Sequence, residues 1–346
     1  MKKIITTVGL LMMILGIFSC KNEEWNFSDF DYTTTYFPYQ YPVRTLVFGD
    51  YTYDNSGDKN LKFLISANMG GVYENKSNVN VGYTVDNTLA DNLFTFDGTP
   101  IKAMPASWYT LSNTSQMVIP NGSFSGGVTV QLTEDFLSDT NSISAYWVIP
   151  LRITTSTTDS ILSGEKNLSN PDPRIADNWT IVPKNFTIFG VKYVNEWHGK
   201  YLLRGTSVIK ESNGDIVETI KYHAKFLEAN AVVSLLTSRR NQVKYSNAIK
   251  QTLGGSPGNF EMKLDFDPED LTTATLTTSN KYPLFPVTGT AKMVKGAESW
   301  NNIARDVVYL DYSITVGTRT HEVKDTLVFR DKAVKFEEFT PKVILP

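Results

Sequence analysis

The chain has a single cysteine, Cys20, among its 346 residues. Without a second thiol it cannot form an internal disulfide, so any folded domain must be stable through its own core. Histidine is also scarce: His198, His223 and His321 lie far apart, and their spacing fits no metal-binding motif. The sequence therefore predicts no metal site and no cofactor.

The chain also lacks a large excess of either positive or negative charge. The 33 basic and 36 acidic residues give a formal net charge of −3, which excludes the basic surface that nucleic-acid binding requires. The chain contains neither a nucleophile-elbow motif nor a glycine-rich phosphate loop. Two carboxylates suited to glycoside hydrolysis are not recognisable in a sequence. We expect no catalytic residues and therefore no enzyme.

The amino-terminal segment has the pattern of a secretion signal. Lys2 and Lys3 precede an apolar run, Ile4 to Phe18, and Ser19 supplies a small residue before Cys20. A run of about 15 residues is too short to span a bilayer. The pattern predicts a signal peptide over residues 1–19, and Cys20 resembles the lipidated cysteine of bacterial lipoproteins. We expect a tether over residues 20–35.

The tether begins with a charged run, Lys21-Asn22-Glu23-Glu24. This run is similar to the export tag of surface lipoproteins of the Bacteroidota. An ordinary solvated tether is the alternative interpretation. We expect a protein anchored to the outer membrane through the lipid on Cys20 and exposed on the cell surface.

Alternation of apolar and polar residues dominates the rest of the chain. It is clear at 79–85, 128–132, 145–153, 260–266 and 308–314. A period of two is typical of half-buried strands, and glycine- and asparagine-rich turns separate these runs. The sequence predicts an all-β fold.

A stretch rich in Gly, Asn and Pro, residues 164–185, predicts a linker between two domains. Residues 36–163 predict an immunoglobulin-like β-sandwich that acts as a spacer. Residues 186–346 predict a second antiparallel β domain, either a calycin-like barrel or another sandwich.

Several strings of residues resemble a known pairing of domains. Tyr36-Phe37-Pro38-Tyr39-Gln40-Tyr41-Pro42 opens the first domain and Tyr146 to Arg152 lies near its end. Asn195-Glu196-Trp197-His198-Gly199 opens the second. Their order resembles the Bacteroidota surface lipoproteins in which domain-of-unknown-function family 1735 (DUF1735) precedes family 4361 (DUF4361). The resemblance covers nearly the whole mature chain.

The resemblance implies an accessory protein of a polysaccharide utilisation locus. Its partners would be an extracellular polysaccharide or oligosaccharide and a porin-type transporter complex. None of the matching strings is a catalytic signature. The resemblance implies glycan capture without naming the glycan.

Glycan sites need exposed aromatic faces with polar groups beside them. Trp300 lies in a polar stretch between two predicted strands and is followed by Asn301 and Asn302. We predict Trp300 as a stacking platform, with Glu298, Asn301 and Asn302 as hydrogen-bonding partners. The alternative is that Trp300 folds back over the mouth of a barrel.

Two further aromatic residues are candidates for glycan contact. Trp179 lies in the predicted linker, where the alternative role is to clamp the two domains together. Tyr245 lies near Asn241, Gln242 and Asn247 and forms a second patch.

The sequence thus predicts a surface lipoprotein that binds glycan without cleaving it. One alternative is a fimbrillin-like adhesin or structural subunit. A second is a divergent glycoside hydrolase.

Overall fold

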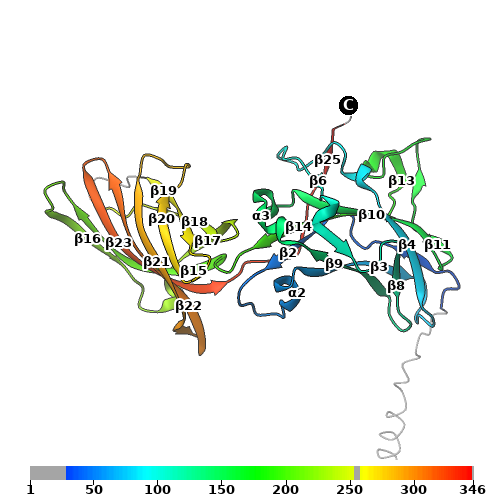
Figure 1. The fold of residues 1–346 in the computed structure, drawn as a ribbon, viewed down its shortest axis with the longest axis horizontal. Coiled ribbons are helices and arrows are strands. Elements are labelled where there is room, and N and C mark those ends of the chain that lie inside the picture. The colour runs from blue at the N-terminus through cyan, green and yellow to red at the C-terminus, as the bar shows by residue number, and fades with distance from the viewer. Residues whose placement is uncertain (1–28, 253–257, 345–346) are drawn as a thin grey trace, which may run out of the picture.

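A computed structural model describes residues 29–252 and 258–344, and Figure 1 shows two β-rich bodies joined side by side. The all-β prediction is confirmed. Helices are short, including α2 (Ser56–Lys59) and α3 (Glu134–Ser138). Within the described ranges, no helix has the length and apolar character needed to cross a membrane. The predicted signal peptide and Cys20 lie outside the described residues.

Two sheets form the first body. The smaller has the order β11 (Ser160–Ile161), β1 (Thr34–Tyr36), β3 (Lys62–Gly70), β9 (Ser125–Leu132) and β7 (Tyr109–Leu111). The larger has the order β24 (Glu337–Glu338), β2 (Pro42–Val47), β14 (Phe186–Val194), β10 (Trp147–Ser156), β4 (Val79–Val85) and β8 (Gln116–Ile119), with β6 (Lys102–Ala103) also on β10. Alternate side chains of β3 and β4 bury a shared core. The predicted β-sandwich is confirmed.

The boundary predicted at residue 186 is wrong, because β14 belongs to the sandwich. This strand pairs antiparallel with β10 and parallel with β2. Both of its faces are buried: Val191 contributes to the main core, and Ile188 contributes to a second cluster on the opposite face. A strand that is buried on both faces belongs in the middle of its sheet. The sandwich therefore continues to Val194.

The predicted linker and tether are also corrected. Residues 164–185 contain a small hairpin of β12 (Glu165–Lys166) and β13 (Trp179–Ile181) at the end of the sandwich remote from the second body (Figure 1). Arg174 holds this segment against the sandwich by donating hydrogen bonds to the carbonyl oxygens of Leu89 (3.0 Å) and Asp91 (2.6 Å). At the other boundary, β1 begins at Thr34 within the predicted tether, and Thr35 is fully buried.

The second body is a closed barrel, which decides between the two predicted folds. Its strands are β15 (Gly199–Lys210), β16 (Ile216–Tyr222), β17 (Ala231–Arg239), β18 (Gln242–Ala248), β19 (Asn259–Phe266), β20 (Thr273–Thr278), β21 (Val287–Trp300), β22 (Ile303–Val316) and β23 (Arg319–Asp331). β15 pairs with both β16 and β17, the strands from β17 to β23 pair in chain order, and β23 pairs back onto β15. Closure removes most of the open edge of the sheet, and β16 pairs on one side only, with β15. Trp197 plugs the barrel, with its ring stacked on Phe266 at 3.9 Å.

The chain crosses between the bodies twice. β14 leads into β15, and after β23 the chain returns to the sandwich, where β24 pairs with β2 and β25 (Lys342–Val343) pairs with β5 (Leu93–Phe94). Lys332, buried at the return crossing, donates to the carbonyl oxygen of Glu196 at 2.5 Å. Arg240 forms two hydrogen bonds to Glu196 (2.6 and 2.7 Å) and lies 4.6 Å from the ring centre of Phe48 in the sandwich. The barrel is thus an insertion into the sandwich.

Candidate functional site

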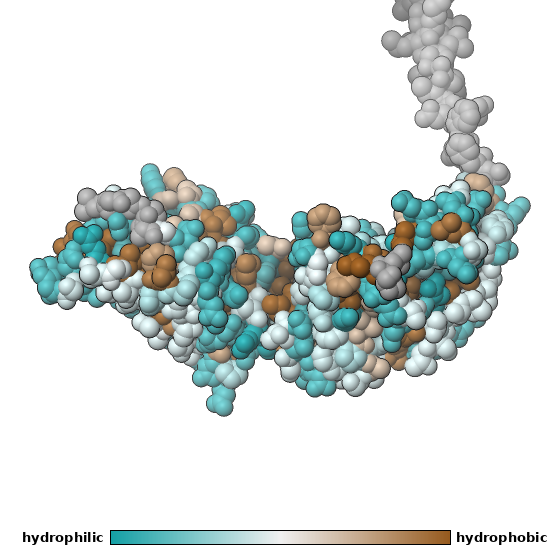
Figure 2. All heavy atoms as spheres, turned by 90° about the horizontal axis from the view of Figure 1, so that it is seen from above, coloured by the Kyte–Doolittle hydropathy of each residue, from teal (hydrophilic) through white to brown (hydrophobic). Residues whose placement is uncertain are grey.

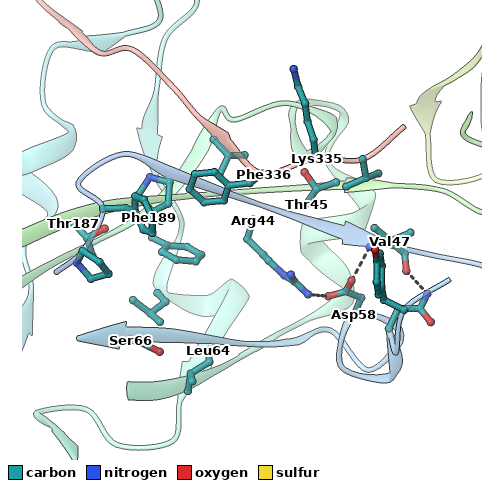
Figure 3. Close-up of a pocket in the computed structure, with 18 of the residues that line it drawn as sticks. Arg44, Thr45, Val47, Asp58, Leu64, Ser66, Thr187, Phe189, Lys335 and Phe336 are labelled. Atoms are coloured by element: carbon teal, nitrogen blue, oxygen red, sulfur yellow. Dashed lines mark hydrogen bonds and ion pairs between the residues drawn. The ribbon is translucent and has the colours of Figure 1, made fainter. Parts of the chain in front are cut away.

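A groove of about 590 Å³ opens between β2 and β3, which belong to the two different sheets of the sandwich. Figure 3 shows β2 above the groove and β3 below it, with the return segment Val334–Phe336 crossing over β2. The volume lies within the range usual for small-molecule sites. We refer to this feature as the β2–β3 groove.

The first pair of aromatic rings in the groove comes from distant parts of the chain. Tyr39, in the turn before β2, and Phe336, in the return segment, have ring centres 4.9 Å apart. The two residues are nevertheless 47% and 61% exposed. A core aromatic pair would be covered, so these rings present apolar surface to the groove and to solvent.

A second pair, Tyr51 and Tyr53, follows β2 directly, with ring centres 5.6 Å apart. Tyr53 is 73% exposed. Deeper in the groove, Phe189 of β14 stacks on Phe63 of β3 with ring centres 5.6 Å apart and an interplanar angle of 7°. The groove therefore has aromatic surface at its rim and at its base.

The main polar group of the groove is the guanidinium of Arg44. Alternation along β2 places Arg44 on the same face as Leu46, which is fully buried in the core. A cation on a core-facing position needs a partner, and Asp58 of α2 forms an ion pair with it (Figure 3). The Arg44 side chain remains 44% exposed. Asp58 is its one hydrogen-bond partner among the described residues, so most of its five donors are available to a ligand.

The loop between β2 and β3 holds Asp58 in place. The other oxygen of Asp58 accepts from the Val47 backbone N–H at 3.1 Å. Asn55, also buried, donates to the carbonyl oxygens of Val47 (2.8 Å) and Gly49 (2.9 Å). The Ser56 backbone N–H donates to Asp54 and lowers the pKa of that carboxyl, which keeps it ionised at the groove. These bonds fix the polar side of the groove before any ligand arrives.

The chemistry of this arrangement is that of binding. A pyranose ring has an apolar C–H face, which packs on aromatic rings, and a rim of hydroxyl groups, which pair with guanidinium, amide and carboxylate groups. The groove provides both kinds of surface. In the part of the chain that the structure describes, no group of three or more His, Cys, Asp or Glu side chains is placed to hold a metal ion.

Trp300, the predicted platform, lies on the outer wall of the barrel. It is half-buried at the end of β21 and packs against a small cluster formed by Leu202, Val307 and Val328. The guanidinium of Arg305 lies 5.2 Å from the centre of its ring. Trp300 therefore folds back onto the wall of the barrel, whereas the alternative interpretation placed it over the mouth.

The predicted polar partners of Trp300 serve local structure. Glu298 forms an ion pair with Arg204 of β15. Asn301 and Asn302 form the turn between β21 and β22, and both have positive φ angles, 54° and 57°. Asparagine is favoured in two-residue hairpin turns because it tolerates this left-handed backbone. Turn chemistry accounts for the Asn-Asn pair.

Tyr245 and Trp179 are also far from the groove. Tyr245 is fully buried inside the barrel, which contradicts its prediction as a surface patch. Trp179 is half-buried in the hairpin of β12 and β13, where its indole N–H donates to the Asp172 carbonyl oxygen at 2.8 Å. That position is remote from the barrel, so Trp179 does not clamp the domains (Figure 1).

The sequence analysis missed the residues of the β2–β3 groove. The one available signal was the cluster of aromatic and proline residues at 36–42, which holds Tyr39 within an apolar, turn-rich string. Phe336 could not be assigned, because only the return of the chain brings it beside Tyr39.

Comparison with known proteins places the chain among bacterial relatives. Residues 196–333 match the family described as Domain of unknown function (DUF5627), and residues 30–160 match a family described as an N-terminal domain. The first match covers the barrel and names family 5627 where the resemblance had named DUF4361. No curated protein matches the chain.

Solved structures extend the comparison. A protein of unknown function from Bacteroides ovatus is 35% identical with a TM-score of 0.82, covering 91% of this chain and 100% of that one. A multidomain protein including DUF1735, also from B. ovatus, is 12% identical (TM-score 0.42; 88% and 97% covered). An auxiliary nutrient binding protein from Bacteroides thetaiotaomicron is 16% identical (TM-score 0.38; 83% and 90% covered).

Proposed function

The chain belongs to the same family as the B. ovatus protein of unknown function, and for this family member we propose that the β2–β3 groove binds extracellular carbohydrate. The observation that carries the proposal is the placement of two aromatic pairs around the guanidinium of Arg44: the exposed pair Tyr39 and Phe336, and the half-buried Tyr51 with the exposed Tyr53. The aromatic rings would stack on sugar rings, and Arg44 would donate to hydroxyl or carboxylate oxygens.

The proposal includes the setting in which the groove works. The charged start, apolar run and small residue before Cys20 support a lipid-anchored protein at the outer membrane surface. There it would capture a polysaccharide or oligosaccharide without cleaving it, as an accessory of a porin-type transporter complex. Weak binding at each groove would suffice, because many anchored copies act together on one polymer.

The test is affinity electrophoresis of residues 22–346 through gels that contain plant, fungal or host polysaccharides. We expect one class of polysaccharide to retard the protein without release of sugar. In Tyr53→Ala and in Tyr39→Ala/Phe336→Ala we expect a loss of about tenfold or more in affinity, since truncation of an aromatic residue that anchors a ligand costs about 2 kcal/mol or more.

The matched control for Tyr53→Ala is Tyr73→Ala, because Tyr73 is 62% exposed on the sandwich but outside the groove. Trp300→Ala tests the earlier prediction in the same gels, and we expect it to bind as the unmodified protein does. Retardation that survives both groove variants would place the site elsewhere, and loss of binding in Trp300→Ala would return it to the barrel wall.

The same preparation distinguishes the two alternatives. A ladder of multimers without retardation by any polysaccharide would favour the fimbrillin-like subunit. Reducing sugar released from a retarding polysaccharide would favour the glycoside hydrolase.

A further inference from the structure

The interior of the barrel contains a buried polar cluster that the proposed function does not use. It is centred on Asp325 of β23, which is 3% exposed. The hydroxyl groups of Tyr222, Tyr245 (3.4 Å) and Tyr312 (2.8 Å) all donate to its carboxyl oxygens. Burial raises the pKa of Asp325, while the three tyrosine hydrogen bonds oppose that shift.

The backbone is shaped to hold this carboxyl group. Gly205 of β15 is paired with Asp325, and a Cβ atom there would collide with an Asp325 carboxyl oxygen and with the Lys324 carbonyl oxygen. The cluster lies where β15 and β23 close the barrel. A slip of one residue in this pairing would turn Asp325 to the outside and separate it from all three tyrosines. The cluster therefore specifies the closing register.

Beside this cluster lies a small void that is lined in part by two buried polar side chains. Ser207 of β15 and His321 of β23 are both fully buried, and neither Ser207 Oγ nor the two ring nitrogens of His321 has a hydrogen-bond partner among the described residues. The void, which they share with Asn247 and Tyr222, offers about 10 Å³ to a water-sized sphere. About 10–15 Å³ on this measure holds one water molecule.

The state of the imidazole fits a neutral ligand. Burial lowers the pKa of His321, and an interaction with the Lys250 backbone opposes this shift. A neutral imidazole has one donor nitrogen and one acceptor nitrogen, and a serine hydroxyl can take either role. Leaving both groups unpaired in the interior would be destabilising.

We propose that this void is a binding site for one water molecule, which bridges Ser207 Oγ and a ring nitrogen of His321 across the seam between β15 and β23. A water molecule matches the size of the void and supplies the donor and the acceptor that the two side chains lack. The site lies inside the barrel and is independent of the groove in the sandwich.

The sign of a stability change tests this proposal. If water bridges the two side chains, Ser207→Ala and His321→Leu each leave the other buried polar group without its hydrogen-bonding partner. Each variant should therefore lower the folding equilibrium constant about tenfold. In the double variant the folding equilibrium constant should also fall about tenfold rather than about a hundredfold, because the second change removes a group that has already lost its hydrogen bond. Urea unfolding followed by circular dichroism measures all three variants.

Ser142→Ala is the matched control, because Ser142 Oγ is also fully buried and without a partner among the described residues, but lies in the sandwich. Its effect should add to that of His321→Leu. Single variants that leave stability unchanged or raise it would overturn the proposal. Removal of a buried polar group that has no hydrogen bond is expected to leave stability unchanged or to raise it. Additive losses in the Ser207→Ala/His321→Leu double variant would also overturn it.

A crystal structure of the unmodified protein gives a second readout that does not depend on the variants folding. We expect one ordered water within hydrogen-bonding distance of Ser207 Oγ and of His321. A void without density, or a His321 ring in which both nitrogens bond directly to protein atoms, would overturn the proposal.

Discussion

Arg44 shows how one residue can serve both the fold and the proposed site. Its position on β2 faces the core, where an unpaired cation would be costly. Asp58 pairs with it and at the same time accepts the Val47 backbone N–H, so the charge is compensated at the end of the sandwich. The ion pair uses only part of the guanidinium, and the rest faces the groove.

This arrangement predicts that Asp58→Ala destabilises the protein. The change leaves the Arg44 guanidinium without its ion-pair partner and the Val47 N–H without its acceptor. We expect the free energy of unfolding to fall by about 2 kcal/mol or more. Urea unfolding measures it. Asp91→Ala, at an exposed carboxylate, should change stability by less than about 0.5 kcal/mol. Equal effects of the two changes would mean that the ion pair contributes nothing.

At the scale of elements, the β21–β22 hairpin explains why sequence and structure disagreed about Trp300. An aromatic residue followed by two amides is typical of a sugar site and of a tight hairpin turn alike. Only the positive φ angles of Asn301 and Asn302 distinguish the two. The prediction of a connection between strands holds for Asn301 and Asn302 only, because β21 continues to Trp300, and the backbone rather than a ligand uses the amides.

We predict that Asn302→Val lowers the stability of the barrel. A β-branched residue in the left-handed region costs about 1–2 kcal/mol. Asn302→Gly should keep full stability, because glycine adopts this backbone freely. Thermal unfolding of the two variants compares them directly. Similar melting temperatures for both would show that the turn is not held in this conformation.

His198 joins the start of β15 to β17, because its Nδ1 accepts the Thr237 backbone N–H at 3.1 Å. Burial, assisted by Lys332, lowers the pKa of His198 from 6.5 to about 4. The unfolded chain therefore takes up a proton on this residue near pH 6.5, whereas the folded protein does so only near pH 4. Stability should fall as the pH drops across this interval, and the loss should be complete below pH 4.

The check is the pH dependence of urea unfolding between pH 4 and pH 7. In His198→Asn this contribution to the slope should disappear. His223→Asn, at an exposed histidine, should retain the slope of the unmodified protein. A slope that is unchanged in His198→Asn would contradict the assignment.

At the scale of the whole molecule, Arg240 connects the two bodies. It lies over Phe48 of the sandwich and holds Glu196, which begins the barrel, with two hydrogen bonds. We predict that Arg240→Ala lowers the melting temperature by about 4 °C or more, since hydrogen bonds between charged groups contribute about 1.5–3 kcal/mol.

Differential scanning calorimetry measures this change. The matched control is the preceding residue, Arg239, because it is exposed and has no ion-pair partner among the described residues. Arg239→Ala should melt as the unmodified protein does. If both variants melt alike, the two bodies are not coupled through Arg240.

The extent of what the sequence could predict also depends on scale. Period-two patterns such as Phe260 to Phe266 were enough to predict an all-β chain, because strand alternation is a local property. The domain boundary was misplaced by the length of β14, since a run of strand residues does not say which sheet it joins. The groove was missed for a related reason: Tyr39 and Phe336 meet only through the return of the chain after the barrel.

That return has a consequence for how the molecule matures. Chains are made from the amino end, so the barrel can close while the sandwich still lacks β24, β25 and the Phe336 wall of its groove. A chain cut short by interrupted translation or by a protease ahead of Phe336 would carry a finished barrel beside an incomplete groove. The groove is therefore complete only in chains that extend through Phe336.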